Sequence, residues 1–127
     1  MKPRESAVRL MRFEAREKGR KVADLESMIR EFEMMTIDLD RQIANEEERI
    51  GVRDLKHFAY STFAKAARQR RENLQTSVED LRAKLAFAIE ERDVAVEALE
   101  KAEHPEVRDP APRGRRPSVR NPDALAS

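Results

Sequence analysis

A stripe of apolar residues in a 3-4 spacing constrains the fold of this chain more than any other feature. Its thirteen positions are Val8, Met11, Ala15, Lys18, Val22, Leu25, Ile29, Phe32, Thr36, Leu39, Ile43, Glu46 and Ile50. All but Lys18, Thr36 and Glu46 are apolar. A stripe sustained for about six heptads favours a coiled-coil helix and is longer than an ordinary surface helix needs. Gly51 follows it directly and suits a left-handed helix cap. The pattern predicts a helix over about 5–50.

A second stripe, or seam, predicts a partner helix over about 61–103, after a turn at about 51–60. Its positions are Tyr60, Ala64, Ala67, Arg71, Leu74, Val78, Leu81, Leu85, Ala88, Arg92, Ala95, Leu99 and Ala102. Only Arg71 and Arg92 interrupt the apolar pattern. Ser61 and Thr62 are suitable cap residues. An earlier start, at Asp54, is an alternative because Leu55 and Phe58 also fit helical spacing.

The composition favours one all-α domain, a two-helix coiled-coil hairpin over 1–103, and a separate tail. The chain has 127 residues, of which 40 % are charged, and no cysteine, so it has neither disulfides nor a thiolate nucleophile. Five of the six prolines fall after residue 104. Proline at this density ends a helix, so residues 104–127 are predicted to form a flexible tail. Without a signal peptide or a membrane-length apolar run, we expect a soluble, cytoplasmic protein with no transmembrane segment.

The distribution of charge favours an antiparallel pairing of the two helices. Residues 1–22 carry 8 basic and 3 acidic side chains, whereas 88–109 carry 3 and 8. The remaining halves are also complementary, with 2 basic and 9 acidic residues in 23–48 against 6 and 3 in 62–87. Parallel helices would bring basic blocks together. The register places Ile29 near Leu81. We expect a monomeric hairpin, because a hairpin closed within one chain needs no second molecule, and an antiparallel dimer that uses the same charges is the alternative.

The sequence carries no pattern typical of catalysis or of a cofactor. The carboxylates are spread along helix surfaces, and His57 and His104 stand at opposite ends of the second helix, so we expect no enzyme, no cofactor and no metal site. The tail arginines Arg113, Arg115, Arg116 and Arg120 are suited to phosphate contacts, but the tail has no aromatic residue on which bases stack, so we expect no nucleic-acid partner.

Several large apolar residues lie outside both seams and indicate partner binding. Leu10 and Phe13 occur near the open end of the hairpin, Met34 and Ile37 near its middle, and Phe63 in the second helix. Methionine adapts well to irregular partner surfaces. The alternative is that long Lys and Arg stems cover these side chains, or that the helices wrap around each other and shelter them.

Two stretches resemble the FliJ family of flagellar type III export chaperones, in its alphaproteobacterial form. They are RLMRFEAREKGRKVADLESMIREFEMMTIDLDRQI at 9–43 and HFAYSTFAKAARQRRENLQTSVEDLRAKL at 57–85, and the likeness spans about 1–103. The segment from His57 to Arg71 is more distinctive than the heptads. The chain departs from the family in its Pro-rich tail, where family members often continue the second helix.

The resemblance implies a non-enzymatic factor for flagellar protein export and motility. It implies a coiled-coil stalk that links the flagellar export ATPase ring to a membrane export-gate protein and helps to carry export chaperones. The protein would be cytoplasmic and peripherally associated with the export apparatus at the inner membrane. The alternative is a generic structural coiled coil, either a scaffold or a homodimeric spacer.

On this analogy we assign two surfaces of five residues each. The ATPase surface, nearest the paired termini, comprises Arg9, Leu10, Arg12, Phe13 and Arg16. The export-gate or chaperone surface comprises Met34, Ile37, Arg41, Phe63 and Arg70. In both, apolar side chains stand among arginines, which is a common composition of binding sites.

Overall fold

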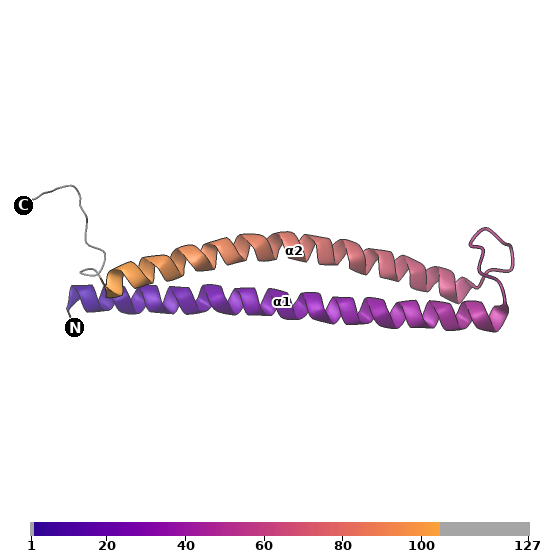
Figure 1. Cartoon of the computed structure of the whole chain (residues 1–127), viewed down its shortest axis with the longest axis horizontal. Coiled ribbons are helices and arrows are strands. Elements are labelled where there is room, and N and C mark those ends of the chain that lie inside the picture. Colours follow the sequence, from indigo (N-terminus) through magenta and orange to yellow (C-terminus); the bar gives the residue numbers. More distant parts are fainter. Residues whose placement is uncertain (1, 105–127) are drawn as a thin grey trace, which may run out of the picture. The chain divides into compact units, whose positions relative to one another are not determined.

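The chain folds into two long helices that form an antiparallel hairpin. The computed structural model describes residues 2–104. Helix α1 spans Pro3–Ile50 and helix α2 spans Thr62–Glu103 (Figure 1). The all-α hairpin predicted from the two seams is confirmed. Both helices begin and end within two residues of the predicted bounds. The tail predicted over 104–127 lies outside the described residues, apart from His104.

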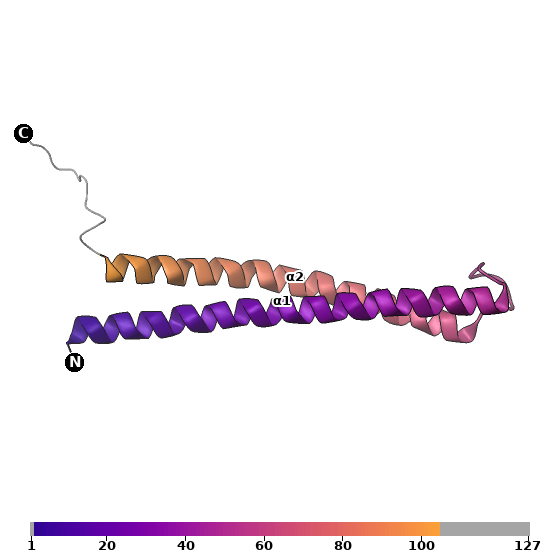
Figure 2. The same ribbon diagram turned by 60° about the horizontal axis from the view of Figure 1, so that its bottom comes forward.

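The hairpin divides into two compact units along its helices. Within the described residues, the first unit contains 2–18 and 91–104, and the second contains 19–90. In each unit the α1 segment lies beside the α2 segment and runs in the opposite direction (Figure 1). In the second unit, α2 crosses behind α1 near the loop (Figure 2).

The predicted seams form the interior of both units, and every seam position is buried or half-buried. The main core of the second unit contains Val22, Leu25, Ile29, Val78, Leu81 and Ala88, with Phe32, Leu85 and Ile89 packed against it. A smaller cluster nearer the loop joins Leu39, Ile43 and Ala67. The first unit has a thinner interior, where Ala15 alone is buried among the described apolar residues. The residues of the predicted pair Ile29 and Leu81 share one core.

The polar residues that interrupt the seams have polar partners. Arg71 donates a 2.9 Å hydrogen bond to Asp40, and Lys18 lies 3.7 Å from Glu91. Thr36 turns its hydroxyl back to a carbonyl of its own helix. These contacts explain how the seams tolerate polar side chains without leaving their charges unpaired.

Ion pairs along one side of the seam join the basic and acidic blocks of the two helices, as the charge distribution predicts. Arg12 contacts Glu103 in the first unit, where the basic block of α1 meets the acidic block of α2. The signs reverse in the second unit, where α1 supplies the acids: Glu33 pairs with Arg82, Asp40 with Arg71 and Glu47 with Arg68. The predicted antiparallel arrangement and register therefore agree with the contacts in each unit. We call this side of the hairpin the ion-pair flank.

Both ends of the connecting loop are capped, as the sequence predicted. Gly51 has a φ of 82° and donates its N–H to the Glu47 carbonyl at 2.8 Å, which closes the end of α1. The Ser61 hydroxyl accepts a 3.1 Å hydrogen bond from the Ala64 N–H, which caps the start of α2. The alternative start at Asp54 is wrong, because α2 begins at Thr62 and residues 55–60 form turns and bends. The Asp54 side chain accepts from the Lys56 N–H, a bond that holds a turn in place of a first helical turn.

Candidate partner-binding surfaces

The most elaborate polar site of the described chain joins the two helices beside the loop. Its three residues, Glu47, Tyr60 and Arg68, form what we call the loop cluster. The Glu47 carboxylate accepts hydrogen bonds from the Tyr60 hydroxyl at 2.7 Å and from the Arg68 guanidinium at 2.8 Å. Arg68 also donates to the Tyr60 oxygen at 2.8 Å, which closes a triangle. Glu47 and Tyr60 are buried, at 6 % and 8 % exposed, whereas the Arg68 side chain is half-buried.

The loop cluster holds Glu47 in its ionised form. Hydrogen bonds from Arg68, and next from Tyr60, lower the pKa of Glu47 and outweigh the effect of burial, which acts in the opposite direction. The same contacts raise the pKa of Arg68. A carboxylate whose pKa is lowered in this way is a poor proton acceptor at neutral pH, so the cluster is suited to fastening the loop.

Glu46 provides a second fastening beside the loop cluster. Its carboxylate accepts a 2.7 Å hydrogen bond from the Ser61 hydroxyl, the same hydroxyl that caps α2. Arg49 also donates to it, and the hydrogen bonds from Arg49 and then Ser61 lower the pKa of Glu46. Neither set of contacts was predicted from the sequence, because the carboxylates were expected to be spread along the helix surfaces and no heptad position indicates where the loop places Tyr60 and Ser61.

The fastened loop presents two apolar side chains to solvent. Phe58 is 96 % exposed and stacks on His57, with 4.7 Å between ring centroids, and Leu55 is half exposed. The backbone beneath them is ordered by turns: His57 donates its N–H to the Asp54 carbonyl, and Tyr60 donates its own to the His57 carbonyl. These two side chains were not among the residues assigned to a partner surface from the sequence.

The predicted ATPase surface lies wholly in the first unit, on α1. Leu10 and Phe13 are 58 % and 52 % exposed. The alternative that long Lys and Arg stems cover these side chains does not hold for Leu10 and Phe13, because about half of each remains accessible to solvent. Arg9 and Arg16 are also exposed and form no ion pair within the described residues, whereas Arg12 is bound to Glu103 at 2.6 Å.

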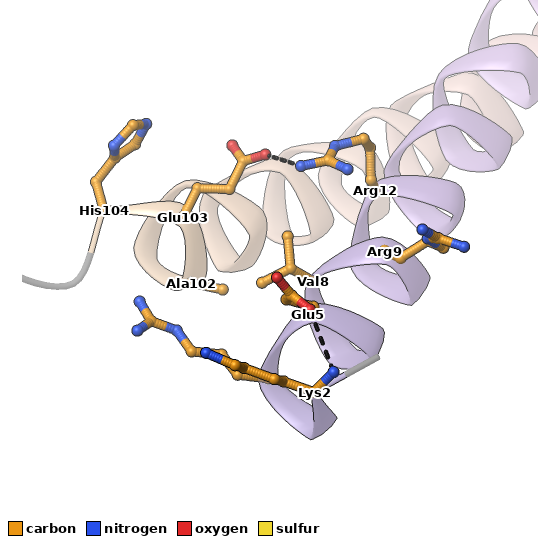
Figure 3. A pocket seen from close by; sticks show the side chains of 9 residues that line it. Lys2, Glu5, Val8, Arg9, Arg12, Ala102, Glu103 and His104 are labelled. Atoms are coloured by element: carbon orange, nitrogen blue, oxygen red, sulfur yellow. Dashed lines mark hydrogen bonds and ion pairs between the residues drawn. The ribbon is translucent and has the colours of Figure 1, made fainter.

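A concave pocket lies beside these residues, between the ends of α1 and α2 (Figure 3). Val8 and Ala102 face each other in it, and the Arg12–Glu103 pair bridges the helices next to them. Arg9 and Arg12 line this pocket, whereas Leu10, Phe13 and Arg16 do not. Two of the five residues predicted for the ATPase surface therefore belong to the pocket, and the other three lie outside it on α1. The remaining lining residues are Lys2, Arg4, Glu5, Glu103 and His104.

The predicted export-gate surface lies in the second unit, and the structure does not bring its five residues together. Met34, Ile37 and Arg41 follow a helical spacing on α1, where Met34 is 64 % exposed and Arg41 pairs with Asp38 at 3.6 Å. Ile37 lines a groove with Glu33 and Glu79, on the ion-pair flank. The rim of this groove is therefore acidic, and not the ring of arginines expected from the sequence.

Phe63 and Arg70 lie on the other side of the hairpin. They precede Lys84 on α2 by 21 and 14 residues, so all three occupy the same heptad position. Lys84 lines a groove with Lys21, which directly precedes the seam residue Val22, whereas the ion-pair residue Glu33 directly follows the seam residue Phe32. At 100° per residue these two kinds of position project on opposite sides of the seam. We call the side with Lys21 and Lys84 the lysine flank.

Two absences are specific to the described part of the chain. Neither α1 nor α2 contains a stretch apolar enough to cross a lipid bilayer. Within residues 2–104, no three His, Asp or Glu side chains converge in a way that would hold a metal ion.

Comparisons of the chain with models of protein families, with curated proteins and with solved structures find no match.

Proposed function

We propose that this chain is a non-enzymatic export factor of the flagellar type III apparatus. In this proposal it acts as a cytoplasmic coiled-coil stalk that links the export ATPase ring to a membrane export-gate protein, and it helps to carry export chaperones. The basis is the resemblance of 9–43 and 57–85 to the FliJ family, together with a hairpin fold of the kind that the resemblance implies.

The exposure of Leu10 and Phe13 is the observation that carries the proposal. Every seam residue is buried or half-buried, yet these two large side chains remain about half exposed next to unpaired Arg9 and Arg16. An apolar centre with basic neighbours suits a protein surface that offers apolar contacts and carboxylates. The location near the paired termini agrees with the end at which the resembling family enters its ATPase ring.

The second partner surface of this proposal centres on Met34 and Ile37. Both are at least half exposed, and neither belongs to the seam. In the proposed arrangement they contact the export gate or a carried chaperone, with Arg41 beside them. Phe63 and Arg70, which the structure separates from them, would contact a different part of that partner or another protein.

A binding experiment with purified flagellar export ATPase tests the proposal. Phe13→Ser with Arg16→Ser should weaken binding by at least about tenfold, because it removes one apolar anchor and one unpaired charge. Phe63→Ser with Arg70→Ser is the matched control: it removes the same residue types from the second unit and should leave ATPase binding unchanged. Both variants should keep the helical circular dichroism of the unmodified chain.

Two outcomes would contradict the proposal. If the unmodified chain fails to bind the ATPase, the flagellar assignment fails. If it binds and both double variants lose affinity equally, the ATPase surface has been placed wrongly. A stable dimer in sedimentation equilibrium, combined with absent ATPase binding, would favour the alternative of a homodimeric spacer.

A further inference from the structure

The two flanks of the second unit differ sharply in how their charges are arranged. On the ion-pair flank, Glu33 and Glu47 each meet an arginine of α2. On the lysine flank, Lys21 of α1 and Lys84 of α2 line one groove, so that like charges flank the seam. Like charges at such positions oppose helix pairing. The free hairpin therefore carries an unfavourable arrangement on one flank alone.

Neither lysine is neutralised within the described part of the chain. Asp24 and Asp80 are the acidic residues nearest to them on the exposed side of each helix, three and four residues away, yet no ion pair forms with either lysine. Along the whole lysine flank of this unit, positions 21, 28, 35, 42 and 49 of α1 and 63, 70, 77 and 84 of α2 contain no Asp or Glu. The flank in this unit thus has basic residues at 21, 49, 70 and 84 with neutral or apolar residues between them, and Arg49 is paired with Glu46.

The groove between the lysines is apolar. Leu25, Ala83 and Phe87 complete its lining, and Phe87 is 61 % exposed. Met28 and Met35 extend the same flank along α1, and they are 42 % and 49 % exposed. An apolar floor between two basic walls has the composition that receives an amphipathic helix.

We propose that the lysine flank of the second unit binds an acidic amphipathic helix of another protein. Its apolar stripe packs on the exposed Phe87 and Met28, above the buried Leu25, and carboxylates on both sides of that stripe meet Lys21 and Lys84. Such a helix would supply the negative charge that the hairpin itself lacks on this flank. The proposal goes beyond the export function and does not depend on it, since it rests on charges and apolar groups within 19–90.

Synthetic helical peptides test this proposal directly. The probe is a four-heptad peptide with Leu at positions a and d and Glu at e and g, and the comparison peptide has Lys at e and g. The acidic peptide should bind the full chain, and the basic peptide should bind at least about tenfold more weakly. Phe87→Ala should weaken binding of the acidic peptide by about tenfold, because it removes the exposed aromatic contact.

Reversing the charges of the two groove lysines should invert the preference of the chain for the acidic peptide over the basic one. Lys21→Glu with Lys84→Glu should lose the acidic peptide and bind the basic one. Arg30→Glu with Lys65→Glu is the matched control, because it changes the net charge equally at exposed positions outside the groove. Equal affinity for the two peptides, or equal losses in the two double variants, would overturn the proposal.

A single reversal separates binding from folding. Lys21→Glu creates an opposite-charge pair with Lys84, so the melting temperature of the free hairpin should rise by about 2 °C while acidic-peptide binding falls. If the variant loses stability and binding together, the groove is a packing feature of the hairpin. If the unmodified chain forms a dimer that Lys21→Glu with Lys84→Glu dissociates, a second copy covers the flank and the proposal is wrong.

Discussion

The Tyr60 hydroxyl donates a 2.7 Å hydrogen bond to the Glu47 carboxylate, and both side chains are buried. This bond ties the end of the loop, two residues before the first residue of α2, to the last turn of α1. Because Arg68 contacts both atoms of the pair, removal of any member leaves a buried polar group without its full set of partners.

Substitutions in the loop cluster should therefore destabilise the hairpin by unequal amounts. Tyr60→Phe removes one hydrogen bond and should lower the free energy of unfolding by about 1–2 kcal/mol. Glu47→Ala leaves Arg68 unpaired and should cost about 2–4 kcal/mol. Urea denaturation followed by circular dichroism measures both. Glu48→Ala, at an exposed neighbouring position, is the control and should change little. A Tyr60→Phe loss as large as that of Glu47→Ala would contradict the roles given to the two residues.

The stability of the hairpin should also depend on Glu47 in acid. Contacts with Arg68 and Tyr60 lower the pKa of Glu47 in the folded chain below its ordinary value of 4.5. The resulting stabilisation is present above pH 4.5 and is lost as the pH falls through the lowered folded-state pKa, because the unfolded chain binds the proton first. Urea denaturation midpoints measured from pH 6 to pH 2 should therefore decrease once the pH is below 4.5. The fall should be smaller in Glu47→Gln, and identical profiles would exclude this contribution.

Leu81 should be far less tolerant of charge than a surface residue of α2. It is 7 % exposed in the main core of the second unit. Leu81→Asp places an unpaired carboxylate among apolar side chains, so it should unfold much of the hairpin, with a large loss of helical circular dichroism at 25 °C. Glu79→Asp, on the exposed surface two residues away, should leave the signal nearly unchanged. A folded Leu81→Asp variant would mean that the core is more open than this packing indicates.

The two glycines of the helices and loop should respond to alanine in opposite directions. Gly51 has a positive φ, so Gly51→Ala should destabilise the chain by about 1 kcal/mol. Gly19 lies within α1, and a Cβ atom there meets nothing within 4 Å, so Gly19→Ala should stabilise by about 0.5–1 kcal/mol. Thermal melts of the two variants provide the comparison, and a stabilised Gly51→Ala would argue against the loop conformation.

The exposed pair Met34 and Ile37 should matter for function more than for folding. Changing both to Glu should leave the helical signal nearly intact, because neither residue belongs to the seam. Under the proposed function, flagellar export and swimming should decline. Asn45→Glu with Glu48→Gln, at exposed positions of α1, is the control. Normal swimming of a Met34→Glu, Ile37→Glu strain whose protein still binds the ATPase would identify this patch as incidental.

The fold was predictable because its determinants are repeated along the chain. Each heptad repeats the same apolar positions, so the pairing of residues such as Ile29 and Leu81 could be predicted from the sequence. The charge blocks indicated that the two helices run in opposite directions. The exposure of Leu10 and Met34 followed from the same pattern, because residues outside the seam of a two-helix hairpin have no second partner.

The details that escaped prediction depend on single contacts. Glu47 differs from the exposed Glu48 partly through Tyr60, which the loop brings back over a separation of 13 residues, and partly through Arg68 of α2. No heptad pattern specifies the course of that loop. The sequence does indicate that Phe63 and Ile37 lie on different sides of the hairpin, since Phe63 shares its heptad position with Lys84. This indication can be used only when the register between the two helices is known.

The contacts of the hairpin are graded by the length of chain that each one closes. The Tyr60–Glu47 bond spans 13 residues, Arg68–Glu47 spans 21, Arg82–Glu33 spans 49 and Arg12–Glu103 spans 91. Short closures lose the least chain entropy, so we expect folding to start at the loop and to proceed like a zipper toward the termini. The thinly packed first unit closes last and opens first. Hydrogen exchange should therefore be fastest around Phe13, and a partner that grips this end would act on the part of the chain that local unfolding reaches most easily.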